Sequence, residues 1–334
     1  MRAKGVFASA TLGIAAFVSS ANAQSGSTVN LYVGYSAGGG YDVYGRMVGR
    51  FMSRHLPGSP TILIQNMPGA GSLRLANWLY AVAPKDGNNF GIVARGIAFD
   101  TLLGLPGTNY DATKFTWIGS AANEVSVCVA WHTSNIKTVD QIFSQEWIVG
   151  GTGGSADTDQ YPKLINGVLG TKMKLVVGYP GGSDVNLAME RGEVQGRCGW
   201  SWSSVKSTAS EWLRDKKINV LMQLSLNKQP DLPNPPLILD LAKTPEQKGI
   251  FQLVFARQVL GRPFLAPPSI PPERAAVLRK AFMDTMQDKE FLAEAERAKL
   301  EITPVSGEEV QKIVADAYAM PPEVIKKTAD LLKE

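Results

Sequence analysis

The sequence is poor in the side chains that build most metal and catalytic centres. Its 334 residues include only two histidines and two cysteines. A Cys₄ or Cys₂His₂ zinc cluster would therefore need help from carboxylates. Lys and Arg number 34 against 30 Asp and Glu, and no run of them forms the basic stripe typical of nucleic-acid binding. The sequence has no G-x-x-x-x-G-K-[ST], and Gly38-Gly39-Gly40-Tyr41-Asp42-Val43 lacks the third glycine of G-x-G-x-x-G. These absences argue against P-loop ATPases and NAD enzymes.

Glycine, in contrast, occupies 33 positions. Hydrophobic residues make up 44% of the chain and charged residues 19%, which is the composition of a globular protein and excludes disorder and collagen. The length suits two lobes or one large α/β domain.

The N-terminus has the pattern of an export signal. Arg2 and Lys4 precede an uncharged stretch from Gly5 to Ser20, and Ala21-Asn22-Ala23 supplies a small-x-small cleavage site. A membrane anchor is the alternative, but the stretch is short for a span of about 20 residues and contains Ser, Thr and Gly. We therefore expect residues 1–23 to be a cleaved signal peptide and the mature protein to be periplasmic.

Export also affects how the two cysteines are interpreted. Cys128 lies in the apolar run Val125–Trp131, and Cys198 follows Glu193–Arg197. In an oxidising compartment the two can form a disulfide, although two separate buried thiols remain the alternative. Neither cysteine has a plausible base beside it in sequence, which disfavours a catalytic thiol.

A short strand, a glycine-rich turn and a helix recur along the chain, as parallel βαβ units require. The pattern predicts a strand at Val29–Tyr35 and a helix at Asp42–His55. Pro162 is expected in the first turn of its helix or as a break in it. The further predicted strands are Thr61–Gln65, Phe90–Ala94, Val125–Trp131, Trp147–Gly151 and Lys174–Val177, and the further helices are Ser72–Val82, part of Asp157–Leu169, Ser183–Arg191, Pro272–Met286, Lys289–Lys299, Gly307–Ala319 and Pro322–Lys333.

Four of the turns between strand and helix are rich in glycine, serine or proline. Backbone N–H groups at such a turn point outward, and the helix dipole there favours a carboxylate or phosphate. The alternative is that any α/β fold needs glycine in tight turns. Four similar turns at the same end of their strands favour a binding cleft. They are Ala37–Gly40, Asn66–Gly71, Gly150–Ser155 and Tyr179–Asp184.

One motif points instead to an enzyme. Gly34-Tyr35-Ser36-Ala37-Gly38 matches the G-x-S-x-G of serine hydrolases and lies between a strand and a helix. His132 is the only plausible partner, because His55 ends the helix that the motif would start. The hydrolase order usually places a histidine later in the chain, where this sequence has none. A secreted serine esterase using Ser36 and His132 is therefore the less favoured alternative.

Five segments, in order along the chain, resemble the solute receptors of tripartite tricarboxylate transporters, the Bug or TctC family. Each segment alone is weakly specific, but together they span about Val29 to Glu309 at appropriate spacing. The segments are Gly38-Gly39-Gly40-Tyr41-Asp42 (family G-G-x-x-D), Asn66-Met67-Pro68-Gly69-Ala70-Gly71 (N-x-P-G-A-G-G), Ala83-Pro84-Lys85-Asp86-Gly87 (A-x-P-D-G-Y), Tyr179-Pro180-Gly181-Gly182-Ser183-Asp184 (Y-x-G-G) and Pro271-Pro272-Glu273-Arg274 at a late helix.

The resemblance implies a type II-like periplasmic binding protein with two α/β lobes, each a mostly parallel sheet flanked by helices. Lobe 1 would comprise residues 24–123 and 226–334, and lobe 2 residues 124–225. Carried over by position, the first-lobe ligand contacts are Tyr35, Ser36, Ala37, Gly38, Gly39, Gly40, Asp42, Asn66, Gly69, Ala70, Gly71, Arg95 and Gly96. The second-lobe contacts are Thr152, Gly153, Gly154, Ser155, Gly181, Gly182 and Asp184, to which we add Trp200.

The chain departs from the family pattern at two of these places. Arg95 stands where the family more often has small hydroxyl residues. A surface arginine is one interpretation, but the end of a central strand favours a bidentate donor to a ligand carboxylate. The segment from Arg197 to Trp202 replaces one that tends to be apolar in relatives. Trp200 with Tyr35 and Tyr41 would suit a flat or aromatic carboxylate, although tryptophans more often pack in cores.

The sequence thus predicts a receptor that performs no chemistry and needs no cofactor or metal. It would hold a small organic carboxylate (a di- or tricarboxylate, or an aromatic acid) by closing two lobes around it. The expected partners are the membrane permease subunits of the transporter, with a sensor kinase as an alternative recipient.

Overall fold

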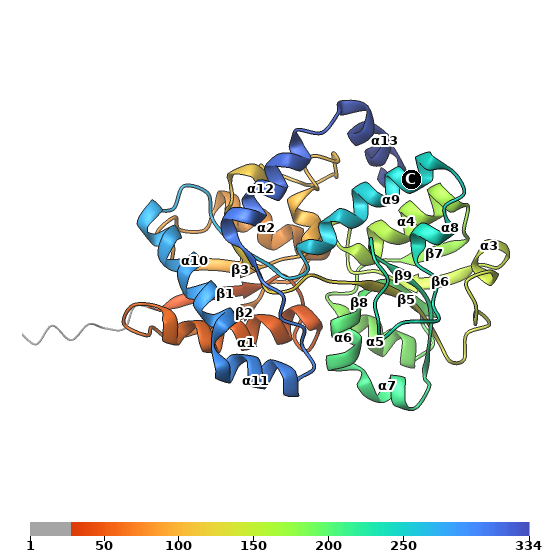
Figure 1. Cartoon of the computed structure of the whole chain (residues 1–334), viewed down its shortest axis with the longest axis horizontal. Coiled ribbons are helices and arrows are strands. Elements are labelled where there is room, and N and C mark those ends of the chain that lie inside the picture. Colours follow the sequence, from red (N-terminus) through yellow and green to blue (C-terminus); the bar gives the residue numbers. More distant parts are fainter. Residues whose placement is uncertain (1–27, 334) are drawn as a thin grey trace, which may run out of the picture.

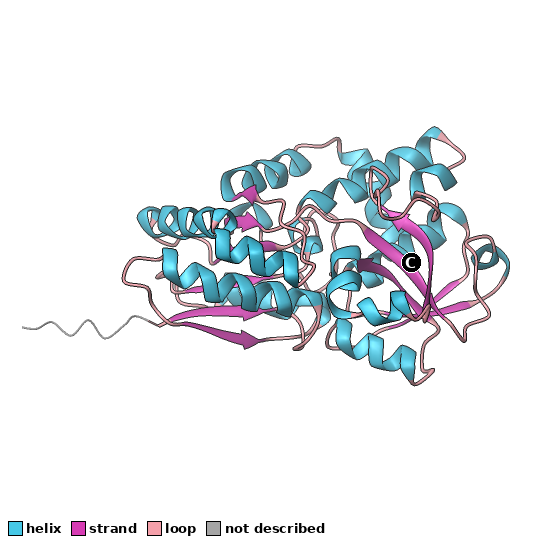
Figure 2. Cartoon of the chain, turned by 60° about the horizontal axis from the view of Figure 1, so that its bottom comes forward, coloured by secondary structure: helices cyan, strands magenta, loops and turns pink. Residues whose placement is uncertain are grey.

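The computed structural model describes residues 28–333, so the predicted signal peptide lies outside the described residues. The chain forms two sheets, each with its own helices, side by side in both views (Figures 1 and 2). The first sheet has the order β11-β4-β10-β3-β1-β2, and the second has the order β7-β6-β8-β5-β9. The two-lobe α/β architecture predicted from the sequence is confirmed.

Both sheets are mixed. In the first, β1 pairs in parallel with β2 and β3, whereas β10 and β11 run antiparallel to their neighbours. In the second, β6 is parallel to β7 and β8, and β5 is antiparallel to β8 and β9. The expectation of mostly parallel sheets is therefore corrected, because the strands near the crossings between lobes enter in the opposite direction. The strands are β1 Val29–Val33, β2 Ile62–Asn66, β3 Asn89–Ile92, β4 Thr116–Ser120, β5 Ser126–Trp131, β6 Trp147–Gly150, β7 Met173–Val176, β8 Gly196–Ser201, β9 Ile218–Leu224, β10 Pro263–Ala266 and β11 Val305–Ser306.

Helices surround each sheet. Those of the first sheet are α1 Gly40–His55, η1 Ala70–Ser72, α2 Leu73–Ala81, η2 Arg95–Ala98, η3 Ala112–Lys114, α10 Pro272–Gln287, α11 Lys289–Arg297 and α12 Gly307–Tyr318. The remaining helices are α3 Gln141–Ser144, α4 Asp157–Leu169, α5 Gly182–Glu190, α6 Trp202–Thr208, α7 Ser210–Arg214, α8 Ile238–Leu241, α9 Pro245–Ala256, η4 Arg257–Val259 and α13 Pro322–Lys333.

Helix α1 shows how the sequence fixes the first lobe. One face buries Met47, Val48 and Phe51. Gly45 and Gly49 bring the helix backbone close to the sheet, because a Cβ on either would lie 3.0 Å from a side chain of β1. The helix therefore sits directly over β1, and its N-terminus is held where that strand ends.

The C-terminal third of the chain contributes helices that pack against both lobes. Helices α10, α11 and α12 pack on the first lobe, but α13 contacts α4 and α9 of the second (Figure 1). Helix α8 likewise contacts β9. The segment 226–334, which was predicted as part of lobe 1, thus supplies β10 and β11 to the first sheet and also helices that contact elements of the second.

Helix α4 differs from its prediction. It runs unbroken from Asp157 to Leu169 with Pro162 inside it, beyond the first turn. Its residues Tyr161, Leu164 and Ile165 are fully buried. Packing of this face against β8 outweighs the loss of one backbone hydrogen bond at proline.

Cys128 and Cys198 are partners in the register of β5 and β8, and a disulfide joins them. Of the two alternatives that the sequence left open, the structure has the paired one. Among residues 28–333, no helix is both long and apolar enough to cross a membrane.

Candidate functional site

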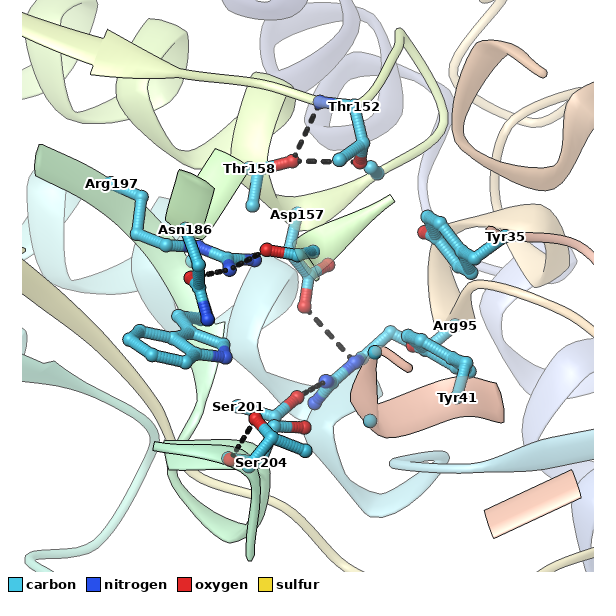
Figure 3. Close-up of a pocket in the computed structure, with 17 residues that line it drawn as sticks. Tyr35, Tyr41, Arg95, Thr152, Asp157, Thr158, Asn186, Arg197, Ser201 and Ser204 are labelled. Atoms are coloured by element: carbon cyan, nitrogen blue, oxygen red, sulfur yellow. Dashed lines mark hydrogen bonds and ion pairs between the residues drawn. The ribbon is translucent and has the colours of Figure 1, made fainter. Parts of the chain in front are cut away.

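A cavity of about 50 Å³ lies between the two lobes (Figure 3). Its first-lobe wall comes from the loop after β1, the start of α1 and the segment after β3. Its second-lobe wall comes from the N-termini of α4 and α5, from β8 and from α6. The lining residues are Tyr35, Gly39, Gly40, Tyr41, Arg95, Thr152, Ala156, Asp157, Thr158, Gly182, Asn186, Arg197, Gly199, Trp200, Ser201, Ser204 and Thr208.

Two tyrosines and the start of α1 form the first-lobe wall. The rings of Tyr35 and Tyr41 stack with centroids 4.7 Å apart and an interplanar angle of 24°. Gly39 is the N-cap of α1, and no side chain caps it. The first N–H groups of this helix are therefore left to meet an acceptor in the cavity.

Asp42 and Asn66 hold the loop of this wall in place through hydrogen bonds. Asp42 Oδ2 accepts a hydrogen bond of 2.9 Å from Gly38 N, and Asn66 Nδ2 donates to Asp42 Oδ1 at 2.8 Å and to Tyr35 O at 2.9 Å. Burial raises the pKa of Asp42, but donors that include Arg46 and Gly38 lower it overall. Both residues belong to the predicted motifs, yet they position the loop and do not line the cavity.

Other predicted loop residues contact the opposite lobe directly. Gly71 N donates to Thr152 O at 3.0 Å, and a Cβ on Gly71 would lie 2.5 Å from Ala156 N. A Cβ on Gly153 would collide with the backbone at Ala70. The glycines of these two loops thus allow the lobes to meet backbone against backbone.

A second interlobe contact joins the loops at Ser36 and Ser183. Ser36 N donates to Pro180 O at 3.2 Å, and Ser183 Oγ donates to Ala37 O at 2.9 Å. Ser36 Oγ donates to Asp184 Oδ2. His132 lies beyond the end of β5, with its ring against Trp131, and no contact joins it to Ser36 within residues 28–333. The geometry gives the esterase alternative no support.

The second lobe presents two helix starts to the cavity. Helix α4 begins at Asp157 after the N-cap Ala156, and α5 begins at Gly182 after the N-cap Gly181. Neither N-cap side chain bonds to its helix. With α1, this makes three helices that direct their positive ends at one space.

Arg95 reaches the cavity but already has protein partners. It is 1% exposed, its Nε lies 3.0 Å from Asp157 Oδ2, and its Nη2 donates to Ser201 Oγ at 2.6 Å. Its Nη1 donates to Gln258. Burial lowers the pKa of Arg95, but Asp157 together with Tyr41, Tyr161 and Glu124 outweighs burial and keeps the pKa above its ordinary value. The arginine that we expected to bind ligand therefore makes an ion pair between the lobes.

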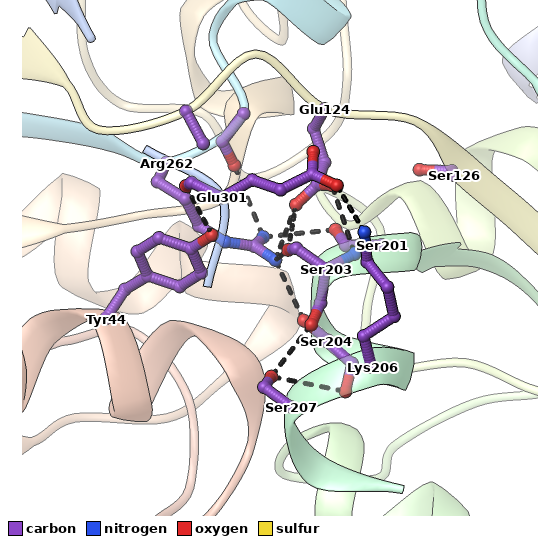
Figure 4. Close-up of polar contacts among 12 residues, drawn as sticks. Tyr44, Glu124, Ser126, Ser201, Ser203, Ser204, Lys206, Ser207, Arg262 and Glu301 are labelled. Atoms are coloured by element: carbon purple, nitrogen blue, oxygen red, sulfur yellow. Dashed lines mark hydrogen bonds and ion pairs between the residues drawn. The ribbon is translucent and has the colours of Figure 1, made fainter. Parts of the chain in front are cut away.

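Two more buried arginines lie in the segment between β9 and β10. Arg257, in η4, has its Nη2 3.1 Å from Asp157 Oδ1 and its guanidinium over the ring of Tyr161. Arg262, beside β10, pairs with Glu124 at 2.8 Å and donates to Ser204 Oγ at 2.8 Å (Figure 4). Each of these guanidinium groups has a carboxylate within reach.

Arg197 on β8 is different. It is 4% exposed, and its Nη1 donates to Gly182 O and to Asn186 Oδ1, both at 2.9 Å. Its guanidinium lies 4.5 Å over the ring of Trp200. No acidic residue pairs with it in the described part of the chain, and burial lowers its pKa to about 9. The cavity wall thus contains a buried cation without a counter-ion.

The structure brings together part of the predicted site. The predicted residues that line the cavity are Tyr35, Gly39, Gly40, Arg95, Thr152, Gly182 and Trp200. The others hold loops or make interlobe contacts next to it. Sequence reasoning missed Asp157, Asn186 and Arg197 as cavity residues, and its one signal was that Arg197 begins a segment that departs from the family pattern.

Two α/β lobes with a cavity between them are the architecture of periplasmic binding proteins, and solved structures share this fold. No family model matches the sequence, and no curated protein matches it. The periplasmic binding protein BugD superposes with a TM-score of 0.73 at 18% identity, over 90% of this chain and 97% of that one. Rpa4515 of R. palustris with adipate gives a TM-score of 0.71 at 19% identity, over 91% and 97%. MatC of Rhodopseudomonas palustris with bound malate gives 0.70 at 19% identity, over 91% and 98%. The resemblance to the Bug and TctC receptors is confirmed at the level of the fold.

Proposed function

We propose that the protein is a solute-binding receptor that captures a small organic carboxylate between its lobes. The observation that carries this proposal is the electrostatic character of the interlobe cavity. Three uncapped helix N-termini converge there with Arg197, a buried cation that has no acidic partner among residues 28–333. Such a site favours an anion, because both helix dipoles and an unpaired guanidinium stabilise negative charge.

The arrangement of the lobes supports capture by closure. Donors from both lobes face the same space, so only the closed state lets one ligand contact them all. The ion pair between Arg95 and Asp157 and the contact of Ser36 with Asp184 also join the two lobes. Closure would therefore bury the anion and complete these contacts together.

The similar structures favour an aliphatic carboxylate as the ligand. Rpa4515 and MatC contain adipate and malate in their solved structures. In this chain, Tyr35 and Tyr41 stack on each other, and Trp200 is covered by Arg197. Because these rings already pack against protein groups, we infer a small aliphatic acid and not the aromatic acid that the sequence also allowed.

No reaction chemistry is needed for this role. Among residues 28–333 no group of three or more His, Cys, Asp or Glu could hold a metal ion. Together with the predicted export signal, the fold supports a periplasmic location and delivery of the ligand to membrane permease subunits. The proposed function therefore includes a periplasmic location and delivery of the ligand to the permease.

A ligand screen tests the proposal. The mature chain is titrated calorimetrically with malate, succinate, adipate, citrate and benzoate, with glucose and calcium chloride as controls. We expect saturable one-to-one binding of at least one aliphatic carboxylate and an increase in melting temperature by mass action. Binding of glucose or calcium with no response to any carboxylate would overturn the proposal.

A further inference from the structure

Arg197 has one edge that no protein group uses. Both hydrogen bonds to its neighbours leave from Nη1, toward Gly182 O and Asn186 Oδ1. Among residues 28–333, Nε is buried and has no hydrogen-bond partner, and the hydrogen bonds of Arg197 leave from Nη1 and not from Nη2. A guanidinium donates two parallel N–H groups along its Nε–Nη2 edge, which matches the spacing of the two oxygens of a carboxylate.

The guanidinium is also held in place. Trp200 covers one face of it at 4.5 Å, and two acceptors fix Nη1 at 2.9 Å. The side chain is therefore preorganised and loses little conformational freedom when a ligand binds. Burying an arginine in this way without a counter-ion costs free energy, so a fixed unpaired edge in a cavity wall indicates a site for an anion.

The neighbours of this edge are helix N-termini from both lobes. A Cβ on Gly182 would lie 3.3 Å from Nη1 and from Nη2 of Arg197, so the start of α5 adjoins the guanidinium. A Cβ on Gly39 would in turn lie 3.5 Å from Gly182 N. The uncapped start of α1 in the first lobe thus meets the Arg197 site of the second lobe only when the lobes are together.

We propose that the Nε–Nη2 edge of Arg197 binds a carboxylate of the ligand as a two-pronged donor and selects for negative charge at the second-lobe wall. The inference deepens the proposed function and rests on it. Arg95 cannot take this role in the closed state, since its three nitrogens face Asp157, Gln258 and Ser201. Because Arg197 belongs to the second lobe, its contact with an anion held at α1 also stabilises closure.

The test compares Arg197→Gln and Arg197→Lys with wild type, using malate and adipate as calorimetric probes. Glutamine removes the charge, and lysine keeps the charge but not the edge. We expect Arg197→Gln to weaken binding about a hundredfold and Arg197→Lys about tenfold. Arg191→Gln, at an exposed position after α5, is the matched control and should leave the affinity unchanged.

The outcomes separate the two proposals. If wild type binds a probe and both Arg197 variants bind it equally well, the role of Arg197 is refuted while the receptor function stands. If wild type binds no carboxylate at all, both the receptor function and the role of Arg197 are refuted. A purely structural role for Arg197 predicts that Arg197→Gln lowers the stability of the ligand-free protein, so a melting curve without ligand is recorded for each variant. Unchanged or increased melting temperatures together with lost binding support the assignment.

Discussion

Replacing Arg197 by glutamine should strongly weaken ligand capture without destabilising the ligand-free protein. Burial lowers the pKa of Arg197 to about 9. Since one unit of pKa corresponds to about 1.4 kcal/mol, the folded state disfavours the charged form by about 5 kcal/mol. The substitution also removes two hydrogen bonds of 2.9 Å and the stacking on Trp200, together worth at least about 3 kcal/mol. We therefore expect the free energy of unfolding to stay level or to rise, by at most about 2 kcal/mol.

Urea unfolding at pH 7, followed by circular dichroism, measures this change. The protein is first dialysed extensively to remove any bound anion, because a bound ligand would add its own stabilisation to wild type. Arg191→Gln serves again as the control for loss of an exposed arginine, and should change the free energy of unfolding by less than about 0.5 kcal/mol. If the free energy of unfolding of Arg197→Gln were lower than that of wild type by more than about 1 kcal/mol, the charge of Arg197 would serve the fold and not a ligand, and the reasoning would be refuted.

Three further substitutions test other parts of the site. Asp157→Asn removes the carboxylate shared by two buried arginines and should cost about 3–5 kcal/mol of stability in urea unfolding, and a neutral result would contradict the pairing. Burial raises the pKa of Asp100 to about 6, so its carboxyl destabilises the fold above that pH and ceases to do so as the pH falls to 4. Asp100→Asn should accordingly gain up to about 3 kcal/mol at pH 7 and almost nothing at pH 4, and a pH-independent gain would count against this. Gly96→Ala places a methyl group against Ser155 O of the opposite lobe and should weaken malate binding at least tenfold, because the methyl group hinders closure. The control Gly154→Ala adds a methyl group that meets nothing within 4 Å and should leave malate binding unchanged. Equal affinities of the two variants for malate would argue against the interlobe contact at Gly96.

The hydrophobic pattern predicted most of the elements correctly because it is local. Helix α1 extends from Gly40 to His55 and α13 from Pro322 to Lys333, close to or at the predicted bounds. Helix α4 shows the limit of local rules, because proline was expected to restrict it and burial of its face preserved it. Strands β4, β8, β9, β10 and β11 were not predicted. Strand β10, for example, pairs with β3 and β4, which precede the whole second sheet in the chain, and spacing along the sequence does not reveal such long-range pairing.

The site was predicted in part. The glycine turns do lie at the ends of strands that face the other lobe, as expected for parallel βαβ units. However, Gly71 and Gly153 lack side chains where the backbones of the two lobes meet, and it is the starts of α1, α4 and α5 that face the cavity. Arg95 and Arg197 could not be distinguished from sequence. Their roles depend on whether a carboxylate lies nearby in space, and Asp157 meets Arg95 only through the fold.

The most direct test of the central claim is a calorimetric titration of malate into the mature wild-type protein and into Arg197→Gln under the same conditions. We expect one malate to bind per wild-type chain and about a hundredfold weaker binding to the variant. Equal affinity of the two proteins for malate would contradict the claim that Arg197 is the charge partner of a carboxylate in the interlobe cavity.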